Sequence, residues 1–112
     1  MADCIFCRIA AGEAPARVVA EDPDVLAIED VRPQAPVHVL VIPRQHVADL
    51  REVGEEGLLA RLMATAKRVA AIKEVADAGY RVVVNVGADG GQEVPHLHLH
   101  VLGGRSMTWP PG

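Results

Sequence analysis

The sequence predicts a single α+β domain with a largely antiparallel sheet of five strands. The chain has 112 residues, half of them apolar, which is enough for one hydrophobic core. Only one long segment has helical periodicity, whereas several short apolar runs are separated by turn-forming residues. A doubly wound fold would need more crossover helices. We therefore expect one α+β domain over residues 1–112.

Five short runs rich in Val, Leu and Ile predict the strands. A turn-forming sequence at 21–24 separates the first two, and the loop 30–36, with two prolines, follows the second. The third run is apolar almost throughout and stops at Pro43, which is typical of a central strand buried on both faces. The predicted strands span residues 17–20, 25–29, 37–42, 80–85 and 97–102.

Two helices are predicted. Apolar residues at helical spacing before Gly12 indicate a short N-terminal helix. A longer helix is predicted over about 55–76, with Gly79 as its C-terminal stop. The tail 103–112 is expected to run extended, because its prolines cannot join a helix. The predicted buried stripe of the long helix is Leu59, Leu62, Met63, Ala66 and Ala70.

Composition excludes several classes of function. The net charge is −4 and no run of Lys or Arg is present, which argues against a nucleic-acid binder. No stretch of 18 apolar residues predicts a membrane span, and the N-terminus does not resemble a signal peptide, so we expect a cytoplasmic protein. A small nucleotide remains compatible, because backbone N–H groups and imidazoles can hold its phosphate.

Three histidines alternate over five residues, at 96, 98 and 100. On a strand they would share one face, with Leu97, Leu99 and Val101 on the opposite, core-facing side. A single histidine is more often a surface or core residue, but three in a row point to metal ligation or catalysis. Desolvation and mutual repulsion should keep the row mostly neutral near pH 7.

Phosphorus chemistry suits such a row. A neutral imidazole can attack phosphorus to form a covalent phosphohistidine, and a second imidazole can donate a proton or hydrogen bond. The glycine-rich stretch Gly87–Gly91 either brings backbone N–H groups toward a phosphate or forms an ordinary turn.

The motifs resemble those of a known family. Asn85, Gly90-Gly91-Gln92 and His96-Leu97-His98-Leu99-His100-Val101 resemble the signature of the histidine triad (HIT) superfamily. Further segments resemble its Hint branch, and they include Cys4-Ile5-Phe6-Cys7, Pro33-Gln34-Ala35-Pro36, Gly103-Gly104-Arg105 and Trp109-Pro110-Pro111-Gly112. The resemblance implies a HIT-like fold in a homodimer, with one sheet that continues across both subunits and the tail at the dimer edge.

The resemblance also implies an activity, the hydrolysis of purine nucleoside 5′-phosphoramidates, and of aminoacyl-adenylates, to release AMP. It makes His98 the nucleophile that becomes nucleotidylated. His100 would bond the phosphate or leaving group, His38 would orient His98 or share a proton with it, and His96 would be structural. The alternative is a nucleotide- or zinc-binding interaction module with only incidental turnover.

The resemblance places further residues around the nucleotide. Asp30 would hold the ribose hydroxyls and Asn85 would line the phosphate site, while Trp109 would reach toward the partner's active site. Glu93 departs from the serine usual there, and we hypothesise that it favours a cationic amine leaving group. The remaining expected nucleotide-binding residues are Ile5, Phe6, Ile9, Ile28, Val31, Gly91, Gln92 and Val94, with His98 and His100.

The two cysteines form a Cys4-x-x-Cys7 pair. With His46 and His96 they would supply the two-sulfur, two-nitrogen set of a structural zinc site, and some members of the superfamily bind zinc with this combination. Two free thiols and a redox pair are the alternatives, although no thioredoxin-like βαβ context surrounds the pair.

Overall fold

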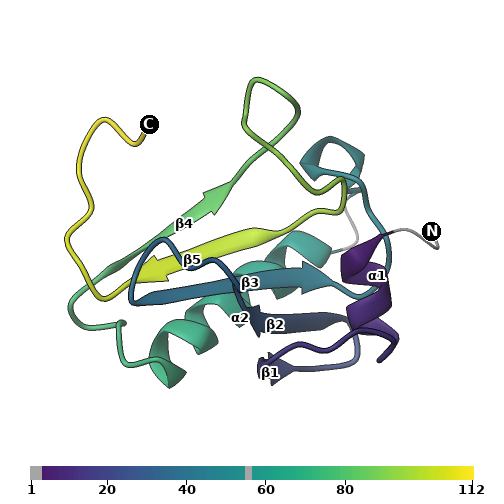
Figure 1. The fold of residues 1–112 in the computed structure, drawn as a ribbon, viewed down its shortest axis with the longest axis horizontal. Helices are drawn as coiled ribbons and strands as arrows, with labels where there is room; N and C mark the ends of the chain where they lie inside the picture. The colour runs from purple at the N-terminus through teal and green to yellow at the C-terminus, as the bar shows by residue number, and fades with distance from the viewer. Residues whose placement is uncertain (1–3, 55–56) are drawn as a thin grey trace.

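The computed structural model describes residues 4–54 and 57–112 and confirms the α+β fold (Figure 1). In these residues one five-stranded sheet has the order β1-β2-β3-β5-β4, and every neighbouring pair is antiparallel. The strands are β1 (Val18–Glu21), β2 (Val25–Glu29), β3 (Val37–Pro43), β4 (Tyr80–Val84) and β5 (Leu99–Gly103). The helices are α1 (Ile5–Ala10) and α2 (Leu58–Ile72), with a 3-10 turn η1 (Leu50–Glu52).

Strand β3 lies in the middle of the sheet, as its apolar run predicted. Its side chains are buried from His38 to Pro43. Leu40 pairs with Ile28 of β2 on one side and with His100 of β5 on the other. Because His38 and Leu40 point to the same face, the register makes His38 a diagonal neighbour of His100.

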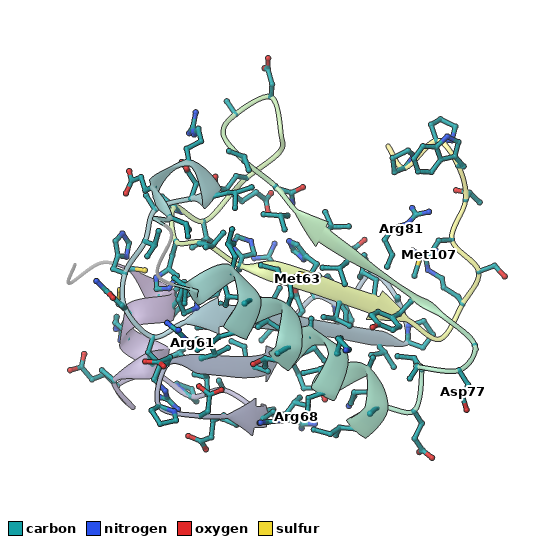
Figure 2. All side chains as sticks on the ribbon, turned by 180° about the vertical axis from the view of Figure 1, so that it is seen from behind. Arg61, Met63, Arg68, Asp77, Arg81 and Met107 are labelled. Atoms are coloured by element: carbon teal, nitrogen blue, oxygen red, sulfur yellow. The ribbon has the colours of Figure 1, made fainter. Side chains whose placement is uncertain are left out.

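The two faces of the sheet are covered differently. Helix α2 packs on one face over a core that includes Val41, Leu99 and Val101 (Figures 1 and 2). On the opposite face, Phe6 of α1 packs with Leu26, Ile28, Leu40 and Ile42. The leucines at 97 and 99 thus face α2, while His98 contacts Phe6. The predicted alternation of apolar and histidine faces is confirmed.

The predicted strand at 97–102 was wrong at its start. Strand β5 begins at Leu99, so only His100 of the histidine row lies within it. The backbone before β5 forms its hydrogen bonds outside the sheet. The His96 N–H donates to the carbonyl of Val94, and the Leu97 N–H donates to that of Val47. His96 and His98 therefore occupy an extended segment that leads into β5.

The predicted long helix was too long. It ends at Ile72, and Glu74 takes the left-handed conformation (φ 60°) that we expected of Gly79. The N–H of Glu74 donates to Ala71 and that of Val75 to Ala70, which is the Schellman pattern that closes a helix. Residues 55 and 56, predicted to start the helix, lie outside the described residues.

The buried stripe of α2 is also displaced from the predicted one. Leu59 and Met63 are 40% and 46% exposed, and Thr65 and Val69 face the core instead, beside Leu62, Ala66 and Ala70. No helix among the described residues is long and apolar enough to span a lipid bilayer.

Candidate active site and metal centre

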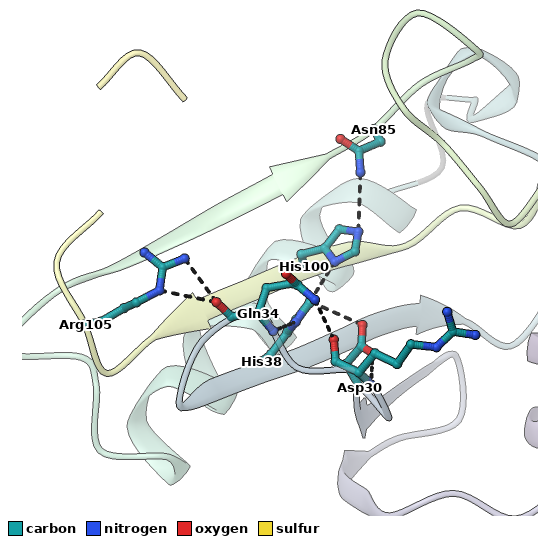
Figure 3. Close-up of polar contacts among 7 residues, drawn as sticks. Asp30, Gln34, His38, Asn85, His100 and Arg105 are labelled. Carbon is teal, nitrogen blue, oxygen red and sulfur yellow. Dashed lines mark hydrogen bonds and ion pairs between the residues drawn. The ribbon is translucent and has the colours of Figure 1, made fainter. Parts of the chain in front are cut away.

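His38 and His100 form the centre of a hydrogen-bond chain on the α1 face of the sheet (Figure 3). The Nε2 atom of His38 lies 2.9 Å from Nδ1 of His100. The backbone N–H of Gln34 donates to Nδ1 of His38 over 3.0 Å. Because that nitrogen accepts, neutral His38 carries its proton on Nε2 and donates it to His100.

This bond fixes the tautomer of His100 as well. Its Nδ1 accepts from His38, so its own proton sits on Nε2, which lies 3.5 Å from Nδ2 of Asn85. Since an amide NH2 group only donates, the Asn85 amide has to turn its Oδ1 toward His100 to accept this proton. Burial, followed by repulsion from His98 and His38, lowers the pKa of His100 to about 4. His100 therefore presents a neutral N–H donor at pH 7.

Asp30 supplies the carboxylate of this chain. Its Oδ2 lies 3.3 Å from Nε2 of His38, and its Oδ1 accepts from the backbone N–H of Arg32. Burial lowers the pKa of His38, whereas the charge of Asp30 opposes that shift. Asp30, His38 and His100 could offer a metal three ligand atoms. The proton on Nε2 of His38, fixed by Gln34, makes this cluster a proton chain instead.

His98 has the opposite tautomer. Its Nδ1 donates to the carbonyl oxygen of His96 over 2.7 Å, since a carbonyl can only accept. The lone pair is therefore on Nε2. The ring is buried, with its centroid 5.2 Å from that of Phe6 and 5.0 Å from that of His100. A neutral imidazole held in this way is a nucleophile beside a hydrogen-bond donor.

His38 was expected to orient His98 or to share a proton with it, and the structure places its hydrogen bond at His100. In the described part of the chain, the ring of His38 bonds Gln34 and His100 and lies beside Asp30. Strand register explains this, because His38 is a diagonal neighbour of His100. His38 thus reaches the reacting region only through His100.

A second cluster joins the N-terminus to the start of the histidine row. The ligand atoms of Cys4, Cys7, His46 and His96 all lie within 4.8 Å of one another. Nδ1 of His96 lies 3.2 Å from the Cys4 sulfur and 3.6 Å from that of Cys7, which is 3.2 Å from Nδ1 of His46. Ligand atoms around a tetrahedral zinc lie roughly 3.3–3.8 Å apart, so these separations fit zinc.

The tautomer of His96 fits a metal equally well. Its Nε2 donates to the Pro43 carbonyl oxygen over 2.8 Å, which leaves the Nδ1 lone pair directed at the two sulfurs. A hydrogen bond of this kind orients histidine ligands in metal sites. The cysteines themselves are held by helix α1, where Cys4 is the N-cap and its sulfur accepts the N–H of Cys7.

The expected nucleotide-binding residues fall into two groups. Phe6, Ile9, Ile28 and Val94 belong to one apolar cluster on the α1 face, next to His98. Ile5 and Glu93 are exposed at the surface. Val31 is 91% exposed and Trp109 is 82% exposed. Within a single chain, the first group therefore lies on the same side as the expected polar residues Asp30, Asn85, His98 and His100, whereas the second group is exposed.

The glycine-rich loop contains turn hydrogen bonds of its own. The N–H of Gly87 donates to the Gln92 side chain, and those of Gly91 and Gln92 donate to carbonyls within the loop. The Gln92 amide also donates to Ala48 and Val94. These N–H groups are therefore engaged within the protein, and Gln92 acts as a brace for the loop.

Sequence reasoning missed three residues whose main chains or side chains define this site. Pro43 acts through a carbonyl, which any residue type could supply, and Gln34 acts through an N–H, which any residue except proline could supply. Arg105 donates to the carbonyl oxygen of Gln34. Gln34 and Arg105 belong to motifs noted above, but no role could be assigned to either from the sequence.

Comparison with known proteins assigns the family. The HIT domain model matches residues 11–107, and the chain belongs to this family. An uncharacterised HIT-like protein of Synechococcus elongatus is 54% identical over 112 residues, covering 98% of this chain and 97% of the relative. The solved structure of a HIT family hydrolase from Legionella pneumophila has a TM-score of 0.95 and 53% identity, covering 98% of this chain and all of that one.

Two further solved structures are relevant to the site. A zinc-bound histidine triad family protein from Mycobacterium smegmatis is 37% identical, with a TM-score of 0.84, over 93% of this chain and 76% of that one. A histidine triad nucleotide-binding protein from Candida albicans is 30% identical, with a TM-score of 0.84, over 96% of this chain and 83% of that one.

Proposed function

We propose that this chain is a Hint-type hydrolase that cleaves the P–N bond of purine nucleoside 5′-phosphoramidates, and of related aminoacyl-adenylates at the acyl phosphate. The observation that carries the proposal is the tautomer of His98. Its Nδ1 is bonded to the His96 carbonyl, so its lone pair lies on Nε2, beside the Nε2–H donor of His100. The hydrolase from Legionella and the nucleotide-binding protein from Candida support the class of reaction and ligand.

The reaction then has two steps. Nε2 of His98 forms a bond to phosphorus, the P–N bond breaks, and its electron pair stays on the amine nitrogen, which takes up one proton. We propose that the neutral His100–His38 pair takes up this proton from solvent when the anionic substrate binds, because the phosphate and the Asp30 carboxylate favour its protonated form, and then passes the proton to the amine. Water then displaces the histidine from phosphorus and returns a proton to the pair.

The test uses adenosine 5′-phosphoramidate. Wild-type protein should release AMP, while His98→Ala should lose turnover and still bind AMP in a calorimetric titration. AMP binding without turnover by the wild type would instead support the nucleotide-binding module. Equal turnover by His98→Ala would overturn the proposed mechanism.

We propose that Cys4, Cys7, His46 and His96 hold a structural zinc ion. The donor set, the ligand separations and the zinc-bound Mycobacterium relative support this. Zinc would tie helix α1 to the segment that carries His98. The reducing cytoplasm, where we place the protein, would keep both cysteines as thiols.

We also propose that the chain acts as a homodimer with a sheet shared between subunits. Strand β4 is an edge of the sheet, and Leu59 and Met63 present apolar surface on α2. The exposed Trp109 would contact the partner's site. Analytical ultracentrifugation should show a dimer, and Met63→Glu should shift it toward the monomer.

A further inference from the structure

The geometry points to Arg105 as a positioning residue for His38. Arg105 follows strand β5, outside the histidine row. Its guanidinium donates to the carbonyl oxygen of Gln34 from Nε over 3.3 Å and from Nη2 over 3.1 Å (Figure 3). Only the kinetic consequence of this inference rests on the proposed function.

Gln34 connects the arginine to the histidine through its own main chain. Its carbonyl accepts from Arg105, and its N–H donates to Nδ1 of His38. Gln34 lies in the loop between β2 and β3, which has neither helix nor strand, and its side chain is exposed. The bonds from Arg105 therefore fasten this loop to the end of β5.

The chain packs closely where this fastening is made. Gly104 has a positive φ of 87°, and a Cβ added there would lie 2.8 Å from Cβ of Pro36. Gly104 thus allows the backbone before Arg105 to lie directly on the same loop. Two independent contacts, at Pro36 and Gln34, join the loop to the segment after β5.

Loss of this restraint would change two tautomers together. If the Gln34 N–H moves away, Nδ1 of His38 is free to take the proton, and Nε2 of His38 becomes an acceptor. His100 would then donate from Nδ1 to His38, and its own Nε2 would lose its proton. The donor that faces the proposed reaction site would be converted into an acceptor. Arg105 therefore acts through Gln34 and His38 on His100.

The test compares Arg105→Ala with Arg81→Ala. Arg81 also donates to a main-chain carbonyl, that of Thr108, which lies outside the loop of Gln34. In protein labelled with ¹⁵N-histidine, wild type and Arg81→Ala should show His38 with an unprotonated Nδ1 and a protonated Nε2. In Arg105→Ala the two nitrogen shifts should move toward each other, as the second tautomer becomes populated.

Kinetics supply a second measurement. Arg105→Ala should lower kcat by about tenfold, a part of the 10²–10⁴-fold that a positioned acid or base contributes, with KM little changed. Arg105→Lys, which keeps the charge without the planar fork, should recover only part of this loss.

The outcomes separate the two proposals. Unchanged His38 shifts in Arg105→Ala would overturn the positioning role, whatever the activity. Shifted tautomers in a protein that releases no AMP would support that role and reject the proposed hydrolase. Gln34→Ala keeps the backbone N–H and should leave the His38 shifts unchanged, since its side chain is not part of the chain of bonds.

Discussion

The imidazole of His98 donates from Nδ1 to the carbonyl oxygen of His96, only two residues earlier, over 2.7 Å. The acceptor is main chain, so no side-chain substitution removes it. The ring of the same His96 belongs to the cluster of Cys4, Cys7 and His46 that we propose as the zinc site. The position of the proposed zinc ligands and the tautomer of the proposed nucleophile therefore depend on one short stretch of backbone.

This bond predicts which nitrogen carries the nucleotide. Because Nδ1 of His98 is protonated and bonded, the covalent intermediate should form at Nε2. The adduct from labelled adenosine 5′-phosphoramidate, trapped by rapid quenching, should match the Nε2-phosphohistidine standard in NMR spectra. His98→Ala should give no adduct, and an Nδ1-linked adduct would contradict the tautomer.

Removal of one zinc ligand should empty the metal site. We expect one zinc per wild-type chain by atomic emission, and none in Cys7→Ser, because three ligands bind the structural metal far more weakly. The free energy of unfolding should fall by about 3 kcal/mol or more, which is the contribution of a ligand present well above its Kd. Arg8→Ala, an exposed change on the same helix, should keep both zinc and stability. Full zinc content in Cys7→Ser would reject the site.

Stability should depend on the neutral state of His100. Its pKa is about 4 in the folded protein and 6.5 without the fold, so the unfolded chain binds more protons between these values. The stabilising contribution is complete above pH 6.5 and is lost as the pH falls toward 4. The loss in free energy of unfolding is on the order of 1–3 kcal/mol. Urea unfolding across this range should show a shallower slope for His100→Gln, and equal slopes would contradict the shift.

The fold was largely predictable because the burial of a strand or helix determines the spacing of its apolar residues. The apolar run before Pro43 identified β3 as the central strand, and alternation around Leu99 identified the two faces of the histidine segment. The end of α2 was less predictable. The left-handed position is taken by Glu74, which a Schellman motif stabilises through hydrogen bonds that composition does not reveal.

The residue types that form the site were predictable from the sequence, but the positions of the protons on the histidine rings were not. The sequence identified the histidines and the Cys4-Cys7 pair, which the fold brings into two clusters. It gave no means to assign tautomers, because these depend on main-chain groups of Gln34, Pro43 and His96. For the same reason the partner of His38 was expected to be His98.

The displaced stripe of α2 gives a direct test of its packing. Leu62 is fully buried against the sheet, so Leu62→Ala should lower the free energy of unfolding by about 2–5 kcal/mol. Lys67→Ala, on the exposed side of the same helix, should change it by less than about 0.5 kcal/mol. Chemical denaturation measures both. Similar effects would mean that the helix does not pack through Leu62.

Glu93 offers a test of leaving-group preference. Its side chain is exposed, between Gln92, which braces the loop, and Val94, which packs beside Phe6. A carboxylate there should attract a cationic amine by about 1 kcal/mol, the order of one charge pair at 4 Å in water. Glu93→Ser should therefore lower the ratio of kcat/KM for cationic over neutral amine substrates by about fivefold.

Added salt should also lower this ratio in the wild-type protein, because salt screens the exposed charge of Glu93. Glu13→Ser, which removes an exposed carboxylate after α1, should leave the ratio unchanged, and an unchanged ratio in Glu93→Ser would reject the hypothesis.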